Sequence, residues 1–172
     1  MTLQFIITTL LSVILFSSCA SYLEPAVNPN DAKAVTRSIT AKRDDFRKRT
    51  YYTGPIASSY PDALLIRAEK TDTGRISYQI YVESAYYGDW RLYNSVYDSN
   101  GTNLNMTVIS REVRACSSSN CSLKESFSID VTQKYLEDNQ FDGIRFKAIG
   151  KKGEQIFFIP SEYIRAFLWA VR

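Results

Sequence analysis

Residues 75–83 read RISYQIYVE, and this stretch decides the fold class because its side chains alternate between apolar and polar. Successive side chains of a β-strand point to opposite faces, so residues two apart share a face. Tyr81 is the one aromatic residue on the polar face. The stretch is therefore predicted to be a half-buried strand. Its apolar face carries Ile76, Tyr78, Ile80 and Val82.

Turn signals follow and precede this strand, and they predict antiparallel hairpins. Asp72-Thr73-Gly74 separates it from an earlier run. Asn100-Gly101 connects two later runs, since Asn and Gly tolerate the positive φ of tight turns. In all, the signals predict about six or seven short strands. The other runs are residues 63–71, 90–98, 103–113, 123–131, 144–146 and 156–159, the last two around a turn at 150–153.

The C-terminal segment changes from a strand period to a helical one. Its apolar residues follow an i, i+3, i+4, i+7 pattern, and Ser161 is a candidate cap for the helix. We expect a short helix that packs on the sheet. The predicted fold is all-β and mainly antiparallel, either a β-sandwich or a partly open barrel. The helical stripe consists of Ile164, Phe167, Leu168 and Val171.

Composition excludes several classes of function. The chain has 172 residues, a net charge of +3 and 13% aromatic residues, which fits one folded domain and not a disordered chain or a dedicated nucleic-acid binder. It contains no histidine. This excludes Ser-His-Asp and Cys-His catalysis and histidine zinc sites. We expect no metal site and no cofactor.

An apolar run near the N-terminus indicates export. Residues 5–16 read FIITTLLSVILF, and Ser17-Ser18-Cys19 follows directly. The run is short for a membrane span and has the length of a signal-peptide apolar region. With small residues just before Cys19, the segment resembles the bacterial lipoprotein signal. An ordinary secretory signal and a buried N-terminal helix are the alternatives.

The resemblance implies a processed and lipidated N-terminus. Residues 1–18 would be the signal peptide, and Cys19 would become an acylated first residue, with palmitate-type chains holding the protein on a membrane. Ala20, and not Asp, follows the cysteine, which in this family implies passage to the outer membrane. The expected location is therefore the periplasmic face of the bacterial outer membrane.

Residues 19–50 are predicted to be a tether and basic linker that precedes a β domain at 51–172 with the C-terminal helix. A helix is expected to start near Asn30 or Asp31, because Val35, Ile39 and Phe46 fall on a helical spacing. The segment is rich in Lys and Arg, and it either rests on anionic head groups or is a solvated spacer or an ordinary exposed helix face.

Cys116 and Cys121 lie close together in a Ser- and Asn-rich stretch. In an oxidising compartment a disulfide between them would staple two strands. A thiol-redox or metal role is the alternative, although the spacing is not that of the two-residue redox motif and two sulfurs alone make a poor metal site.

Glu125 falls in register with the apolar residues of its strand, so it is predicted to be a buried carboxylate. A buried carboxylate needs a partner or a raised pKa, and Arg111 or Arg114 on the neighbouring strand can supply the charge. A structural ion pair is the favoured interpretation, and a catalytic carboxylate is the alternative.

Tyrosines and one tryptophan gather near residues 85–91, which makes this segment the first candidate for a contact surface. Aromatic side chains on a β scaffold stack on sugars or anchor a protein partner. Packing between strands is the competing explanation. The candidate surface residues are Tyr86, Tyr87, Trp90 and Tyr93, while Tyr51, Tyr52 and Tyr60 lie further away.

The sequence predicts a non-catalytic binding or structural lipoprotein that contacts a protein or an envelope glycan. The protein is expected to contact the membrane through the lipid on Cys19, and no nucleic-acid partner is expected. The alternative function is an envelope hydrolase that uses Asp and Glu, since carboxylate pairs need no histidine.

Overall fold

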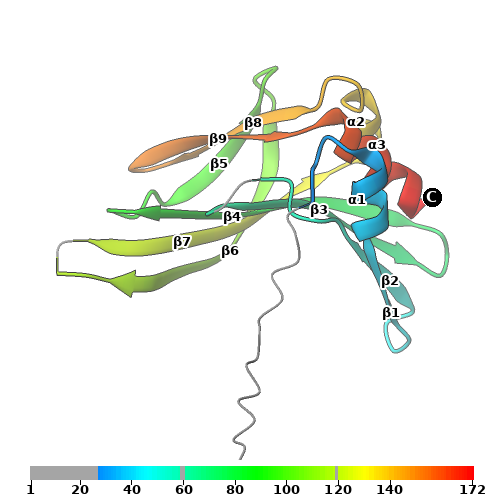
Figure 1. Cartoon of the computed structure of the whole chain (residues 1–172), viewed down its shortest axis with the longest axis horizontal. Helices are drawn as coiled ribbons and strands as arrows, with labels where there is room; N and C mark the ends of the chain where they lie inside the picture. Colours follow the sequence, from blue (N-terminus) through cyan, green and yellow to red (C-terminus); the bar gives the residue numbers. More distant parts are fainter. Residues whose placement is uncertain (1–26, 59–60, 119) are drawn as a thin grey trace, which may run out of the picture.

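A computed structural model describes residues 27–58, 61–118 and 120–172, so the segment predicted to be a signal peptide and Cys19 lie outside the described residues. The described chain is mostly antiparallel β-structure with short helices (Figure 1). The strands are β1 (Thr40–Asp44), β2 (Arg49–Thr53), β3 (Ala63–Thr71), β4 (Ile76–Tyr87), β5 (Tyr93–Asp98), β6 (Asn103–Cys116), β7 (Cys121–Val131), β8 (Ile144–Gly150) and β9 (Gly153–Ile159). The helices are α1 (Ala32–Ser38), α2 (Gln133–Asp138) and α3 (Ser161–Val171).

The strands form one sheet in the order β1-β2-β3-β4-β7-β6-β5-β8-β9, and every neighbouring pair is antiparallel. This confirms the predicted all-β class. The sheet doubles back near β5, which pairs with β6 only through Val96 with Leu104 and Tyr97 with Asn103. Figure 1 shows β5, β8 and β9 above the layer of β3, β4 and β7. The sheet stays unclosed between β9 and β1.

The predicted hairpins are confirmed. β3 and β4 pair from Ala63 with Glu83 to Lys70 with Ile76, and Gly74 has the positive φ that the turn requires, +86°. Gly101, at φ +78°, closes the turn between β5 and β6.

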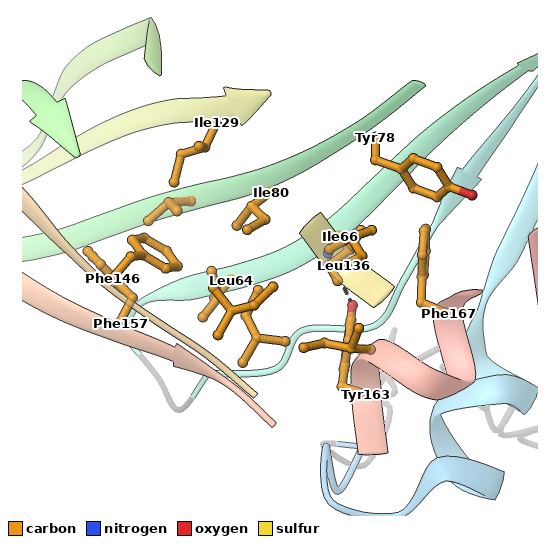
Figure 2. Close-up of a cluster of buried hydrophobic side chains, with 14 of the residues drawn as sticks. Leu64, Ile66, Tyr78, Ile80, Ile129, Leu136, Phe146, Phe157, Tyr163 and Phe167 are labelled. Carbon is orange, nitrogen blue, oxygen red and sulfur yellow. Dashed lines mark hydrogen bonds between the residues drawn. The ribbon is translucent and has the colours of Figure 1, made fainter. Parts of the chain in front are cut away.

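The core lies between the two layers of the folded-over sheet. Aromatic rings bridge them: Phe127 of β7 meets Phe157 of β9 edge-on at a centroid distance of 6.2 Å, and Phe157 stacks on Phe146 at 5.3 Å. Figure 2 shows Phe146 and Phe157 opposite Leu64 and Ile80 of the lower layer. Edge-on and offset contacts of this kind are favoured between aromatic rings.

Helix α3 closes the open end of this core, as predicted. Its whole apolar stripe is buried. The Tyr163 hydroxyl donates to the carbonyl of Pro55 at 2.6 Å and accepts from the amide of Ile66 at 3.3 Å, which ties the helix to β3 (Figure 2). The N-cap is Pro160 and not Ser161, whose hydroxyl donates to Glu162 instead.

The expected start of a helix near Asp31 is confirmed, because the Asp31 carboxylate caps α1, but the assignment of residues up to 50 to a linker outside the β domain is wrong. Helix α1 ends at Ser38, and β1 and β2 form a hairpin that belongs to the sheet. Val35 is buried in the core, so the folded unit begins before residue 51. The carboxylate of Asp44 accepts from the backbone amides of Phe46 and Arg47, both at 3.0 Å, which favours a turn where the helical spacing predicted a helix.

Candidate functional site

Glu125 is buried and fully hydrogen-bonded. It lies on β7 opposite Arg111 of β6, and its exposed fraction is 1%. Its carboxylate accepts from Nε of Arg111 at 3.0 Å, from the amides of Leu92 and Tyr93 at 2.8 and 3.1 Å, and from the hydroxyl of Tyr86. The structure therefore pairs Glu125 with Arg111 and not with Arg114.

These contacts keep Glu125 ionised. Burial raises its pKa, but the bonds from Tyr86, Arg111 and the two backbone amides together outweigh burial, so the pKa lies below its usual value. A general acid needs a raised pKa and a free oxygen near the substrate. The arrangement suits a structural ion pair and does not suit proton donation.

A second set of polar side chains continues from this ion pair across the core. The guanidinium of Arg91 stacks 4.1 Å over the ring of Tyr86 and donates to the hydroxyl of Tyr93 at 2.7 Å. It also donates to the side-chain oxygen of Gln155, whose amide nitrogen donates to Asp62 at 2.6 Å. Because each of these buried or partly buried groups has partners, the network stabilises one end of the sheet.

The structure divides the four candidate surface aromatics between core and surface. Tyr86 and Tyr93 are buried, so the prediction that they form a contact surface is wrong. Trp90 is partly buried and packs against the core. Tyr87 alone is strongly exposed, with an exposed fraction of 76%. The reason is the alternation of β4, which turns Tyr86 inward and Tyr87 outward.

Tyr87 lies on a face of the sheet that no described helix covers. We call this face, formed by β2, β3, β4, β7 and β6 and lower in Figure 1, the open face. At one end it is hollowed by about 490 Å³. This first hollow is lined by Pro61, Ala85, Tyr86, Tyr87, Arg114 and Ser122.

A second hollow of about 350 Å³ lies at the other end of the open face, where β2 meets β3 and β4. It combines tyrosine rings with hydroxyl, amide, carboxylate and guanidinium groups. A neighbouring hollow of about 260 Å³ shares Glu69 and Ser77 with it. The second hollow is lined by Tyr51, Tyr52, Thr53, Arg67, Ala68, Glu69, Ser77 and Gln79.

Arg67 is the unusual residue of the second hollow. Its guanidinium lies 3.8 Å over the ring of Tyr81, and its Nε is buried with no hydrogen-bond partner among the described residues. Burial lowers its pKa, although it remains a cation at neutral pH. An unpaired buried donor of this kind is unusual, because it has lost its hydrogen bonds to water without a replacement.

Sequence reasoning missed Arg67. It stands on the polar face of β3, where its type and spacing match an ordinary exposed arginine. Its burial arises from the ring of Tyr81 on β4, and that contact depends on strand register.

Cys116 and Cys121 form a disulfide, with their Cα atoms 4.0 Å apart. They are register partners at the ends of β6 and β7, so the bridge staples this hairpin as predicted. The amide of Gly88 donates to the carbonyl of Cys121 at 3.2 Å, which places the bridge near the first hollow.

One pair of carboxylates on the open face bears on the hydrolase alternative. Nζ of Lys124 lies 3.7 Å from Glu83 and 3.2 Å from Glu112. Bonds from Ser110 and Lys124 lower the pKa of Glu112. The lowered pKa of Glu112 does not suit the role of a general acid.

Within the described ranges, no helix has the length and apolar character to cross a membrane. The same residues contain no cluster of three or more His, Cys, Asp or Glu side chains that could hold a metal ion. Comparison with protein-family models, with curated proteins and with solved structures found no match to this chain.

Proposed function

We propose that this protein is a bacterial lipoprotein, acylated at Cys19 and held on the periplasmic face of the outer membrane, whose open face binds an envelope glycan without catalysis. The apolar run that ends at Ser17-Ser18-Cys19 supports the anchor. The disulfide between Cys116 and Cys121 is consistent with an oxidising compartment.

The second hollow carries the binding proposal. Sugars are recognised by stacking on aromatic rings together with hydrogen bonds to hydroxyl and carbonyl oxygens. Tyr51 and Gln79 line this hollow, and Arg67 adds a charged guanidinium to the lining. An uncharged or acidic glycan fits these groups, and a protein partner is the competing occupant.

The hydrolase alternative has less support. Glu125 and Glu112 both have lowered pKa values, and each is occupied by cationic or hydroxyl partners. A glycosidase needs one carboxylic acid that is protonated near neutral pH.

Mass spectrometry of the protein extracted from membranes tests the anchor. We expect an N-terminal Cys19 that carries acyl chains. A Cys19→Ala variant should remain unprocessed and lose the acyl mass. An unmodified N-terminus at another residue would refute the lipoprotein assignment.

Equilibrium titration of the full chain with purified envelope glycan fragments tests the binding site. Arg67→Gln should weaken binding by about tenfold, because it removes a charge-assisted donor. Arg145→Gln, which removes an exposed arginine of β8, is the matched control and should bind like the unchanged protein. Equal binding by both variants, or crosslinking of the open face to proteins alone, would count against a glycan ligand.

A further inference from the structure

The β1–β2 hairpin presents a bare aromatic ring at its tip. Phe46 has an exposed fraction of 102%, compared with 72% for Phe141 and 76% for Tyr87. Figure 1 shows the hairpin turning away from the sheet, on the side opposite β8 and β9. Covering a fully exposed phenylalanine with an apolar partner removes its whole ring from water, which is favourable.

The hairpin is braced, so the position of Phe46 is fixed by specific bonds. Asp44 accepts from the amides of Phe46 and Arg47 and closes the turn. Arg43 donates to Asp72 of the β3–β4 turn, with Nη2 and Oδ2 2.7 Å apart. The amide of Asp72 in turn donates to the carbonyl of Lys48 at 3.1 Å.

The hairpin is also where the charge of the chain concentrates. Residues 40–53 hold five basic and two acidic residues, a net +3 that equals the net charge of the whole chain. The two acidic residues are engaged, because Asp44 holds the turn and Asp45 pairs with Arg43 at 3.1 Å. Lys42 and Lys48 flank the tip with no salt bridge among the described residues.

We propose that this tip docks on an anionic phospholipid surface, with the ring of Phe46 in the interfacial layer and Lys42, Arg47 and Lys48 on the head groups. An aromatic side chain surrounded by flexible cations is the combination that binds such an interface. Phe46 does not line any of the three hollows described on the open face.

The choice of a phospholipid surface as the partner rests on the lipid anchor of the proposed function. Cys19 precedes Val27, the first described residue, by eight positions. A fully extended chain of that length spans at most about 29 Å. A protein acylated at Cys19 therefore keeps its folded part close to the bilayer, where a weak second contact becomes effective.

Tryptophan quenching in vesicles tests the docking. The processed full chain is reconstituted into phosphatidylcholine vesicles with or without phosphatidylglycerol, and brominated acyl chains serve as the quencher. Phe46→Trp adds emission at the tip, and Phe141→Trp adds it at an exposed site away from the hairpin. With phosphatidylglycerol present, we expect quenching of the added emission to be several-fold stronger for Phe46→Trp.

A charge reversal tests the head-group contact. Lys42→Glu with Arg47→Glu should reduce the quenching of Phe46→Trp by at least half, because each cation contributes to binding of an anionic surface. The control is Lys151→Glu with Lys152→Glu, the same charge reversal in the β8–β9 turn. It should leave the quenching of Phe46→Trp unchanged.

Two results would overturn the inference. One is equal quenching at positions 46 and 141, and the other is quenching at position 46 that is the same with and without phosphatidylglycerol and with and without the charge reversal. Mass spectrometry of the same preparation reads the acyl group on Cys19 separately. A missing acyl group would contradict the proposed function, whereas an acylated protein with an unquenched tip contradicts only the docking.

Discussion

Glu125 holds a buried charge in place, and Glu125→Gln should destabilise the domain by about 2 to 4 kcal/mol at pH 7. Removing one member of a buried ion pair leaves the other uncompensated, which typically costs about 3 to 5 kcal/mol. The side chain of Arg111 is 35% exposed, so solvent relieves part of that cost. Urea denaturation measures the change. Glu112→Gln, on the exposed side of the same hairpin, should cost about 1 kcal/mol or less.

The effect of Glu125→Gln should depend on pH. The pKa of Glu125 is lowered in the folded protein, so its contribution is complete above the unfolded pKa, about 4.5, and disappears as the pH falls through the folded value. The difference between the variant and the unchanged protein should shrink on acidification below about pH 4.5. A difference that stays constant down to pH 2 would show that the carboxylate charge contributes nothing.

Phe167→Ala should lower the free energy of unfolding by about 3 to 5 kcal/mol, because the ring is completely buried on α3. Trp169→Ala is the matched control on the same helix, and its exposed fraction of 68% predicts a change within about 0.5 kcal/mol. Chemical denaturation gives both values. Equal midpoints for the two variants would mean that the stripe of α3 does not face the core.

At the residue scale, the alternation of apolar and polar residues predicted which side chains of a single strand are buried. It missed burial that results from a contact between side chains on two strands. The apolar register of β7 predicted a buried Glu125 with Arg111 or Arg114 as its partner, and the structure selects Arg111. Arg67 was missed because its burial comes from Tyr81 on the next strand. Tyr86 and Tyr87 are chemically alike, and their separation into core and surface follows from the pleat of β4.

The disulfide is the clearest feature at the element scale, and its removal should weaken the domain without unfolding it. Cys116→Ser with Cys121→Ser opens a loop of only a few residues, so chain-entropy arithmetic predicts a loss of about 2 kcal/mol. Thermal unfolding should give a lower midpoint with the fold retained by far-ultraviolet circular dichroism. Free thiols in freshly isolated protein would show that the bridge is absent in the cell.

Elements with a clear apolar period were predicted, whereas α2 and the β1–β2 hairpin were not. The strands that build the core and helix α3 each carry such a pattern. Helix α2 spans six residues and is capped by the Thr132 hydroxyl, a signal too local to stand out. The β1–β2 hairpin was missed because its apolar residues matched a helical spacing, whereas Asp44 and pairing with β3 set its conformation.

At the scale of the whole molecule, the sequence predicted the class but not the way the sheet folds over. Sandwich and partly open barrel stayed alternatives because both use the same strands. The path is decided where β6 pairs with β7 over most of its length and with β5 through two residue pairs. That division of one strand between two partners is a property of register, and no local pattern encodes it.

Helix α3 covers the open end of the core inside this folded sheet. Deletion of residues 161–172 should therefore unfold the domain, and the effect should not be limited to the loss of a terminal segment. Four buried side chains of its stripe contribute roughly 1.5 to 3 kcal/mol each, which rivals a typical net stability of about 5 to 15 kcal/mol. Tyr163 also satisfies the amide of Ile66, and Nζ of Lys70 donates to the carbonyl of Val171 at 3.3 Å. Without α3, the buried face of β3 would be open to water. Near-ultraviolet circular dichroism and urea titration of the truncated chain should show no cooperative transition. A cooperative transition at an unchanged midpoint would mean that the sheet is stable without its helix.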